Sequence, residues 1–400
     1  MTVGSFVAAM AFGASVAGAP RFEAVTVDGK VGIGYGVAVA DVDGDKKPDI
    51  LLIDKDILAW YRNPTWEKSV LVEKLTPLDH VCLAARDLDG DGKAEVAAGA
   101  GWNPSDTVGS GSLHFLIRKA DRTARWEAIR LPHEPTVHRM RWMKARAGGW
   151  NLVVAPLHGR GNKDYKGEGV KILAYKLPAD PKQKWETEEI DGSFHVVHNF
   201  DPLQWDDDPE EEMLAGSKEG VFLFDRVADK WQRTILAAPP AGGDGTLFAS
   251  EVRVGRAGGR NRFFATIEPF HGNKVVVYTP PEGGSPGGEP GGDRAGLWSP
   301  HLLDDTLNGG HALAFGDLLG TGGDQLVAGW RLKDKSGKVG IRMYVPADEK
   351  WEKWKTFPVD DNAMACEDLT LADLNADGRL DVIAAGRDTH NLVVYFNRGT

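Results

Sequence analysis

The stretch from Gly36 to Arg62, GVAVADVDGDKKPDILLIDKDILAWYR, sets the pattern for the whole chain. It predicts a buried strand, an acidic turn, a second buried strand and a third strand that carries aromatic residues. The turn runs from Asp41 to Asp49, and Gly44 lies at its sharpest bend. Carboxylates at alternate positions let several oxygens face one point, which is the arrangement that calcium requires.

The same unit returns along the chain, so the protein is built from repeats. Full copies of the acidic turn occur at Asp87 to Glu95 and at Asp373 to Asp381. A degenerate copy, with fewer carboxylates, runs from Asp317 to Asp324. The carboxylate and amide groups that we predict as calcium ligands are Asp41, Asp43, Asp45, Asp49, Asp87, Asp89, Asp91, Glu95, Asp373, Asn375, Asp377 and Asp381. We expect these turns to stiffen the fold and not to catalyse.

A second periodic mark, an aromatic residue followed by a polar residue and an alternating strand, fixes the number of repeats. The mark begins at Phe22, Trp66, Trp126, Trp185, Trp231, Trp298 and Trp351. We interpret each mark as the start of an outermost strand. The innermost strands are then expected to start near Gly34, Asp79, Thr136, Phe194, Leu247, Gly310 and Cys366.

These marks predict an all-β fold, a seven-bladed β-propeller that spans 20–400 as one domain. Because the first mark is N-terminal, we expect its strand to pair with the last strand, Asn391 to Asn397, and to close the ring. Closure leaves only short, protected sheet edges. The alternatives are an open solenoid and a β-sandwich.

The net charge and the N-terminal segment limit which partners and which cellular location we expect. The formal net charge of -11 argues against nucleic acid, whose binding depends on Lys and Arg. Residues 1–19 are apolar and small and end in Ala17-Gly-Ala19, which resembles a signal-peptidase site, so we expect an export signal and an exported protein. That segment is too short and too weakly apolar for a membrane span. Cys82 and Cys366 are expected to be free and buried.

Eight of the 11 histidines are expected on one face of the disc. In a propeller, the starts of innermost strands and the ends of second strands meet at the same face. The histidines in such positions are His80, His138, His158, His195, His198, His271, His311 and His390. One histidine alone is usually structural, but several blades aimed at one funnel form a concave polar site suited to a small ligand.

Two spacing arguments refine this set. His195 and His198 are three residues apart, so on a regular strand one would line the funnel while the other braces a loop. Glu251 and Arg253 are two residues apart and share a face, which suits either a buried ion pair or a site role. Arg160, Glu268, Arg331 and Arg387 occupy loop positions on the same face.

The chain also resembles known families. Its acidic turns resemble the FG-GAP or VCBS repeat. The segments HVVHNFDPLQWDDDPEEEMLAGSKEGV (His195 to Val221), APLHGRGN (Ala155 to Asn162), SEVRVGR (Ser250 to Arg256), IEPFHGNKVVVYTP (Ile267 to Pro280) and GGHALAFGDL (Gly309 to Leu318) resemble the propeller domain of the aldos-2-ulose dehydratase family. That family eliminates water from keto-sugars such as 1,5-anhydrofructose. The plan is also similar to that of seven-bladed polysaccharide lyases acting on uronate-containing glycans.

The resemblance implies a metal-assisted active site in the funnel, with histidines as ligands and base. No sequence here corresponds to the dehydratase's C-terminal cupin-like part, so we expect only the dehydration to be supported. Elimination beside a carbonyl needs a base, a Lewis acid or donor for the enolate, and an acid for the leaving hydroxyl. The funnel residues with expected roles in catalysis or substrate contact are His80, His138, His195, His198, His311, Arg160, Tyr35, His158, Glu251, Arg253, Glu268, Arg331 and Arg387.

Roles within that set stay open. Our hypothesis is that two or three of His138, His198, His271 and His311 bind Zn²⁺ or another divalent metal, with Glu251 as a further candidate ligand. Either His80 or His195 would take the proton, and either Arg160 or Tyr35 would orient the sugar. The rival hypothesis is a non-catalytic, calcium-stabilised propeller that binds glycans or protein partners.

Overall fold

The computed structural model describes residues 18–121, 124–146, 148–206, 208–239, 248–257, 260–281, 296–348 and 350–400. Most of the predicted export signal and the predicted strand start at Leu247 lie outside these residues. No α-helix occurs in the described ranges. Accordingly, none of them contains a helix with the length and apolar character needed to cross a membrane.

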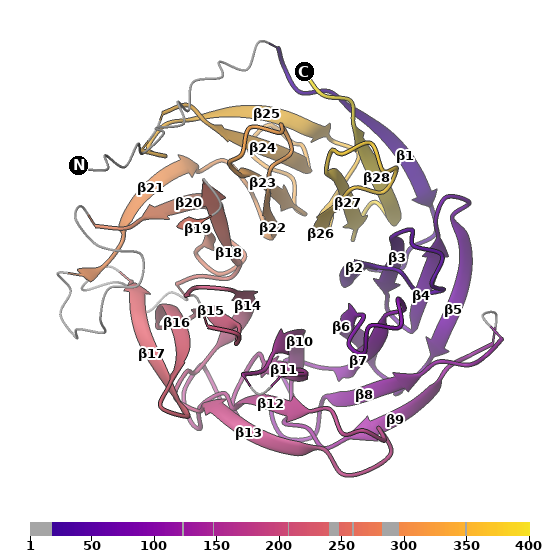
Figure 1. Ribbon diagram of the computed structural model, residues 1–400. Helices are drawn as coiled ribbons and strands as arrows, with labels where there is room; N and C mark the ends of the chain where they lie inside the picture. Colours follow the sequence, from indigo (N-terminus) through magenta and orange to yellow (C-terminus); the bar gives the residue numbers. More distant parts are fainter. Residues whose placement is uncertain are drawn as a thin grey trace, which may run out of the picture.

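Seven four-stranded antiparallel sheets stand around a common axis, as blades of a propeller (Figure 1). The innermost strands are β2 (Gly36–Ala40), β6 (Asp79–Arg86), β10 (Val137–Lys144), β14 (Val197–Leu203), β18 (Val252–Ala257), β22 (Gly310–Gly316) and β26 (Cys366–Ala372). The second strands are β3 (Asp49–Ile53), β7 (Glu95–Trp102), β11 (Trp150–Pro156), β15 (Glu212–Ser217), β19 (Arg260–Glu268), β23 (Gln325–Trp330) and β27 (Asp381–Gly386).

The third strands are β4 (Ile57–Arg62), β8 (Ser112–Ile117), β12 (Ile172–Lys176), β16 (Gly220–Val227), β20 (Lys274–Thr279), β24 (Gly340–Pro346) and β28 (Asn391–Asn397). The outermost strands are β5 (Glu67–Glu73), β9 (Glu127–Leu131), β13 (Glu186–Asp191), β17 (Lys230–Ala237), β21 (Ser299–Asp304), β25 (Trp354–Asp361) and β1 (Phe22–Asp28). Blades one to seven are numbered by their innermost strands in chain order. The seven-bladed prediction is confirmed.

The ring closes as predicted. Strand β1 pairs antiparallel with β28, and Phe22 lies opposite Asn397. The last blade therefore joins the two ends of the chain in one sheet, and Figure 1 shows β1 beside the C-terminus. Pairing the first strand into the last blade stabilises the ring against opening.

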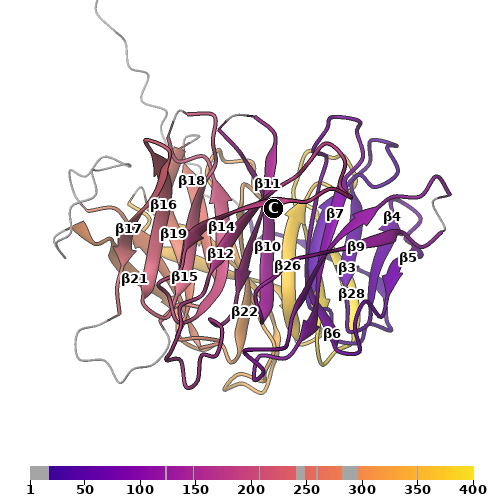
Figure 2. The same ribbon diagram turned by 90° about the horizontal axis from the view of Figure 1, so that it is seen from below.

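Apolar residues pack between blades, because each sheet buries both faces. Val137 and Met140 of blade three pack with Cys82 and Leu113 of blade two in one cluster. Val37 and Ile50 of blade one pack against Ile383 and other residues of blade seven. Seen from the side, the blades form a disc whose strands run between its two faces (Figure 2). Cys82 and Cys366 are both free and buried, as predicted.

Candidate functional site

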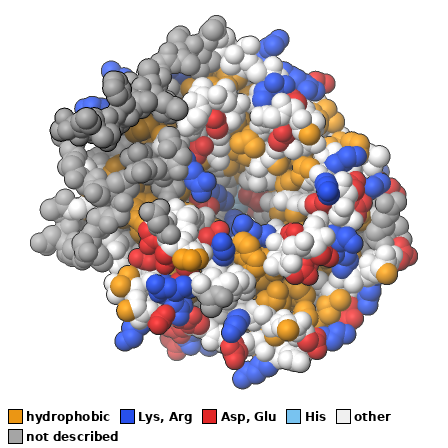
Figure 3. Space-filling model, in the orientation of Figure 1, with side chains coloured by type: hydrophobic (Ala, Val, Ile, Leu, Met, Phe, Trp, Pro, Cys, Tyr) orange, Lys and Arg blue, Asp and Glu red, His pale blue; other side chains and the backbone are white. Residues whose placement is uncertain are grey.

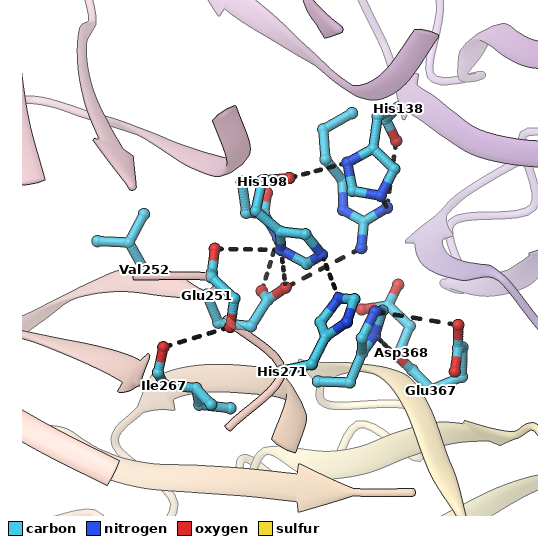
Figure 4. Close-up of polar contacts among 12 residues, drawn as sticks. His138, His198, Glu251, Val252, Ile267, His271, Glu367 and Asp368 are labelled. Carbon is cyan, nitrogen blue, oxygen red and sulfur yellow. Dashed lines mark hydrogen bonds and ion pairs between the residues drawn. The ribbon is translucent and has the colours of Figure 1, made fainter. Parts of the chain in front are cut away.

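Four histidines from four blades lie together at one end of the disc axis. His138, His198 and His311 are each the second residue of an innermost strand, and His271 follows the end of β19. The ring centroid of His198 lies 4.8 Å from those of His138 and His271 and 5.3 Å from that of His311. Figure 4 shows His198 and His271 pointing toward one another across the blades.

Irregular strand pairing places these side chains. The register of blade three shifts between Val137 and Arg139, so His138 has no partner residue on β11. Equivalent shifts leave His198, His311 and Glu367 without partners in blades four, six and seven. A bulge of this kind redirects a side chain. Here the unpaired residues are those that gather around the axis.

Hydrogen bonds fix the tautomers of two of the rings. His198 Nδ1 lies 3.1 Å from the Ser250 carbonyl oxygen, and His311 Nδ1 lies 2.6 Å from that of Glu367. Because a carbonyl oxygen only accepts, each Nδ1 carries the proton and each Nε2 keeps a lone pair. His198 Nε2 is 2.9 Å from His271 Nε2. One ring nitrogen each of His198, His271 and His311 lies within 4.8 Å of the other two.

Burial keeps these rings neutral. It lowers the pKa of His198, and it lowers that of His271 to about 2, with the positive charge of Arg331 acting in the same direction. Burial and Arg331 hold the pKa of His311 well below its usual value. A metal ion binds the neutral imidazole, and His198 and His311 keep a lone pair on Nε2 for it. His271 accepts from Arg331 at Nδ1 and donates from Nε2 to His198, so its proton would have to leave Nε2 before that atom could bind a metal.

Two buried carboxylates surround the rings. Glu251 is 1% exposed; its Oε2 accepts a hydrogen bond of 2.6 Å from Asn199 Nδ2, and its Oε1 lies 3.1 Å from His198 Nδ1. Burial alone would raise the pKa of Glu251, but His198, Arg253 and Arg139 lower it to about 2. The pair is therefore a neutral imidazole beside an ionised carboxylate.

Glu367 is the second carboxylate. Its oxygens lie 2.9 and 2.7 Å from Arg331 Nη1, and Arg387 Nη1 is 3.0 Å from Oε1. Arg331 Nη2 in turn lies 3.4 Å from His271 Nδ1. Arg331 and Arg387 are thus at the site, as predicted.

The donor set fits a zinc-type ion. Three neutral imidazoles are common ligands of Zn²⁺, and hydrogen bonds from their other ring nitrogens to oxygen acceptors normally orient them. His198 and His311 have such bonds. His271 lacks one, because an arginine faces its Nδ1. His138 stands apart from the metal prediction, since its Nδ1 bonds to the His198 carbonyl and its Nε2 to Arg139.

Other predicted residues lie away from this cluster. His80 is fully buried and its Nε2 accepts the Leu75 N–H, so its contacts do not support the expected role as the base. In blade two the residue skipped by the pairing is Val81, which is why His80 is directed differently. Glu268 accepts hydrogen bonds from Thr266 and Tyr278 within its own blade.

The remaining predicted residues occupy loops around the cluster. Arg160 pairs with Glu134, and His158 forms an isolated β-bridge with Val196. Because Glu268 and Arg160 have these partners, the expectation that they grip the ligand lacks support from their contacts.

His195 and Tyr35 keep groups that can act on a ligand. The strand starts at Val197, so His195 precedes it; its Nδ1 lies 2.8 Å from Glu219 Oε1, and its side chain is 37% exposed. The expected split between the two histidines assumed a regular strand through both of them, and because β14 starts only at Val197 that assumption does not hold. The Tyr35 hydroxyl donates to Asp79, and burial and Asp79 raise the pKa of that phenol.

An axial channel of about 370 Å³ adjoins the cluster and is lined by residues from all seven innermost strands. Figure 3 shows the hollow at the centre of the disc face, bordered by basic and acidic side chains. Arg253 in this channel was among the predicted site residues. Sequence reasoning missed Arg139, Arg141, Asp201 and Asp368, although the alternation of arginines in VHRMRW indicates that they share one face of β10.

The acidic turns lie at the other ends of the innermost strands. Carboxylates gather in blade one as Asp41, Asp43 and Asp45 and in blade two as Asp87, Asp89 and Glu95. Gly44 at the bend has a φ of 81°, which glycine adopts without strain. A third group that the sequence analysis missed comprises Asp206, Asp208 and Glu212 of blade four.

Other predicted calcium ligands have different contacts. Both oxygens of Asp49 accept backbone N–H groups, from Val42 and Asn63, and those of Asp381 do the same from Leu374 and Asn397. Arg62 Nε lies 2.7 Å from Asp43 Oδ2, so an arginine already offsets part of the charge in blade one. The carboxylates of Asp91, Asp373 and Asp377 fall outside the gathered groups. In blade seven, Asn375 Nδ2 lies 3.2 Å from Asp377 Oδ2.

Comparisons with known proteins agree with this architecture. Residues 110–281 match the family described as aldos-2-ulose dehydratase, beta-propeller domain, and residues 41–98 match the FG-GAP-like repeat. A curated relative, aldos-2-ulose dehydratase of Phanerodontia chrysosporium, is 23% identical over 358 residues. That alignment covers 83% of this chain and 38% of the relative. The resemblance expected from the sequence is confirmed.

Solved structures support the fold alone. A chain in a crystal structure of the mitotic checkpoint complex is 10% identical, with a TM-score of 0.54, and the alignment covers all of both chains. A chain in the crystal structure of BBS1N in complex with ARL6DN is 13% identical, with a TM-score of 0.57. That alignment covers 96% of this chain and 97% of the other.

Proposed function

We propose that this propeller, which resembles the β-propeller domain of aldos-2-ulose dehydratase, is a carbohydrate-active carbon-oxygen lyase. Its reaction would be β-elimination on a keto-sugar like 1,5-anhydrofructose or on a uronate-containing glycan. The relative's name supports the carbohydrate class. The observation that carries the proposal is the convergence of three neutral imidazoles, His198, His271 and His311, at one end of the axis.

These three histidines would hold the metal ion, and Glu251 and the Ser250 carbonyl would orient His198. When bound, a zinc-type ion supplies a Lewis acid that polarises a carbonyl and lowers the barrier to removing the neighbouring proton. Arg331, held by Glu367, is placed to bind a polar group of the sugar beside His271.

His195 is the best candidate for the base that removes the α-proton. Glu219 accepts a hydrogen bond from its Nδ1, which leaves Nε2 as the acceptor. The Nε2 lone pair of a neutral imidazole can take up a proton, which suits this role. Tyr35 stays protonated because burial and Asp79 raise its pKa; its proton is donated to Asp79, so its oxygen would accept a hydrogen bond from a sugar hydroxyl and orient the sugar.

We further propose that the acidic turns bind structural calcium, at the end of the strands away from the histidines, and that the protein is exported. The gathered carboxylates of blades one and two support the calcium proposal. The apolar segment at 1–19 supports export. Neither proposal bears on the elimination chemistry.

Single replacements test the metal-assisted reaction. We expect His198→Ala and His311→Ala to lose tightly bound transition metal and to lower kcat/KM by about 10²-fold or more, since Lewis-acid catalysis contributes several kcal/mol. The absorbance of the unsaturated product measures turnover, and elemental analysis measures the metal. His301→Ala is the matched control, because His301 lies on an outermost strand and contacts Thr279.

Undiminished turnover in both variants would remove these residues from the mechanism. Purified protein that holds calcium but no transition metal, and that turns over none of a panel of keto-sugars and uronate oligosaccharides, would favour the rival role of a non-catalytic binding propeller.

A further inference from the structure

The axial channel contains charged side chains whose ion pairs within the described residues are long or missing. Arg139 and Arg141 project from β10, Arg253 from β18, Asp201 from β14 and Asp368 from β26. They therefore face the same 370 Å³ space from four different blades. Charged groups deep in a protein are usually paired or bind a ligand.

The distances distinguish these arginines from those outside the channel. Arg331 lies 2.7 Å from a carboxylate oxygen of Glu367. In contrast, the carboxylate nearest to Arg253 and Arg139 among the described residues is that of Glu251, at 3.7 and 4.0 Å. The same carboxylate also lies 3.1 Å from His198 Nδ1. Arg141 forms no ion pair within the described part of the chain; its Nη1 donates a hydrogen bond of 2.8 Å to the Met140 carbonyl.

The aspartates of the channel do not neutralise these cations directly. Asp201 Oδ2 accepts the Val254 N–H at 3.0 Å, and Asp368 Oδ2 accepts the Val37 N–H at 2.8 Å. Neither aspartate forms an ion pair among the described residues. The aspartates and the arginines therefore line the channel of about 370 Å³ without direct ion pairs between them.

The electrostatic balance favours an anion near the arginines. Burial and the positive charges of Arg253 and Arg139 together lower the pKa of Arg141 to about 10, and the negative charges of Asp368 and Asp201 offset this decrease only in part. An anionic group among the guanidinium groups would relieve this repulsion. Guanidinium groups bind carboxylates well, because their planar donors match the two oxygens.

We propose that the axial channel is a binding site for a sugar acid of monosaccharide size. Its carboxylate would bind Arg141 and Arg253, and its hydroxyls would donate to Asp201 and Asp368. The volume is at the small end of ligand pockets, which span roughly 300–1,000 Å³, so it suits one sugar ring better than a glycan chain. Mixed acidic and basic lining favours a polyhydroxylated acid over an inorganic anion.

The channel adjoins the histidine cluster through Arg139. The guanidinium of Arg139 bonds to His138, and it lies 4.0 Å from Glu251, which in turn contacts His198. A sugar acid in the channel would therefore have one end beside the histidines. Its role as the substrate rests on the proposed function, whereas its binding does not.

Calorimetric titration of the whole protein tests the binding. We expect D-glucuronate to bind and D-glucose to bind at least about tenfold more weakly, because the carboxylate adds charge-assisted hydrogen bonds. Arg141→Gln should weaken glucuronate binding by about tenfold or more. Arg146→Gln is the matched control, since Arg146 is exposed and lies only within about 4 Å of surface aspartates.

Equal affinity for glucose and glucuronate, equal affinity for sulfate and glucuronate, or unchanged binding in Arg141→Gln would each overturn the proposal. Thermal unfolding checks that this variant folds, and Arg253→Lys, which keeps the charge but loses the planar donors, gives a second test with the same expected loss. His311→Ala should retain glucuronate binding. If glucuronate binds but the protein turns over no substrate, only the proposed function is contradicted. If the protein turns over a neutral keto-sugar but does not bind glucuronate, only this inference is contradicted.

Discussion

At the scale of single residues, burial decides the charge of the histidines. Outside the cluster, His114 shows this most clearly: it is 6% exposed, its Nε2 contacts Ser112, and its Nδ1 has no partner. Burial, together with the positive charge of Arg130, lowers its pKa to about 4. His114 is therefore neutral in the folded protein and protonated in the unfolded chain below about pH 6.5.

This difference predicts a loss of stability in acid. The contribution of His114 is complete above pH 6.5 and falls as the pH drops from 6.5 toward 4, because the unfolded state then binds the extra proton. His114→Gln should reduce the fall in unfolding free energy between pH 7.5 and pH 5 by about 2 kcal/mol. Urea unfolding of chelated protein at both pH values measures it. An equal fall in wild type and variant, with His301→Gln as control, would contradict the assignment.

At the scale of elements, the acidic turn joins an innermost strand to a second strand, and its backbone hydrogen bonds hold it without a cation. In blade two, Asp87 accepts from Gly90 and Gly92, and Glu95 accepts from Leu88. The same carboxylates gather with Asp89. Like charges at close range repel, so a bound cation would stabilise the turn further.

We therefore expect calcium to raise the melting temperature, and chelation to lower it. At a concentration 100 times Kd, one site adds about 2.7 kcal/mol to the unfolding free energy. Asp89→Asn keeps the Oδ1 acceptor but removes a charge, so it should reduce the calcium-dependent shift. Asp361→Asn makes the same charge change at a side chain that is 66% exposed, lies at the end of β25 and belongs to none of the gathered groups. If calcium does not change the melting temperature of the wild-type protein, the proposed calcium sites are contradicted.

At the scale of the whole molecule, buried asparagines tie blades together. Asn397, which is fully buried, donates through Nδ2 to the Leu318 carbonyl at 2.7 Å and to the Leu380 carbonyl at 3.2 Å. Leu318 follows the innermost strand of blade six, so the end of the chain is fastened to the neighbouring blade. Asn63 does the same between blades one and seven, through the Leu374 carbonyl at 2.7 Å.

Asn397→Ala should destabilise the ring by roughly 2–4 kcal/mol, because it removes the donor from the buried Leu318 carbonyl and from the partly buried Leu380 carbonyl. Asn308→Ala removes a single exposed bond to the Lys333 carbonyl and should cost less than about 1 kcal/mol. Denaturant titration measures both variants. If both variants lose the same unfolding free energy, the hydrogen bonds that Asn397 makes between blades do not stabilise ring closure.

The sequence by itself determined the number of blades, the ring closure and the face on which the histidines lie. The number of blades and the ring closure depend on local sequence signals. The aromatic mark occurs once in each blade, and an acidic turn, where present, joins the first two strands of its blade. The bend at Gly44 and the strand that starts at Phe22 could be read directly. Strand direction then places residues at one face or the other without knowledge of packing.

Only the tertiary structure decided which rings meet. His80 and His138 are both the second residue of an innermost strand, yet the pairing of blade two skips Val81 whereas that of blade three skips His138. A shift of one residue turns a side chain to the other side of the sheet. The sequence likewise does not show how close the channel arginines lie to Glu251. Packing between the blades sets these distances across the axis.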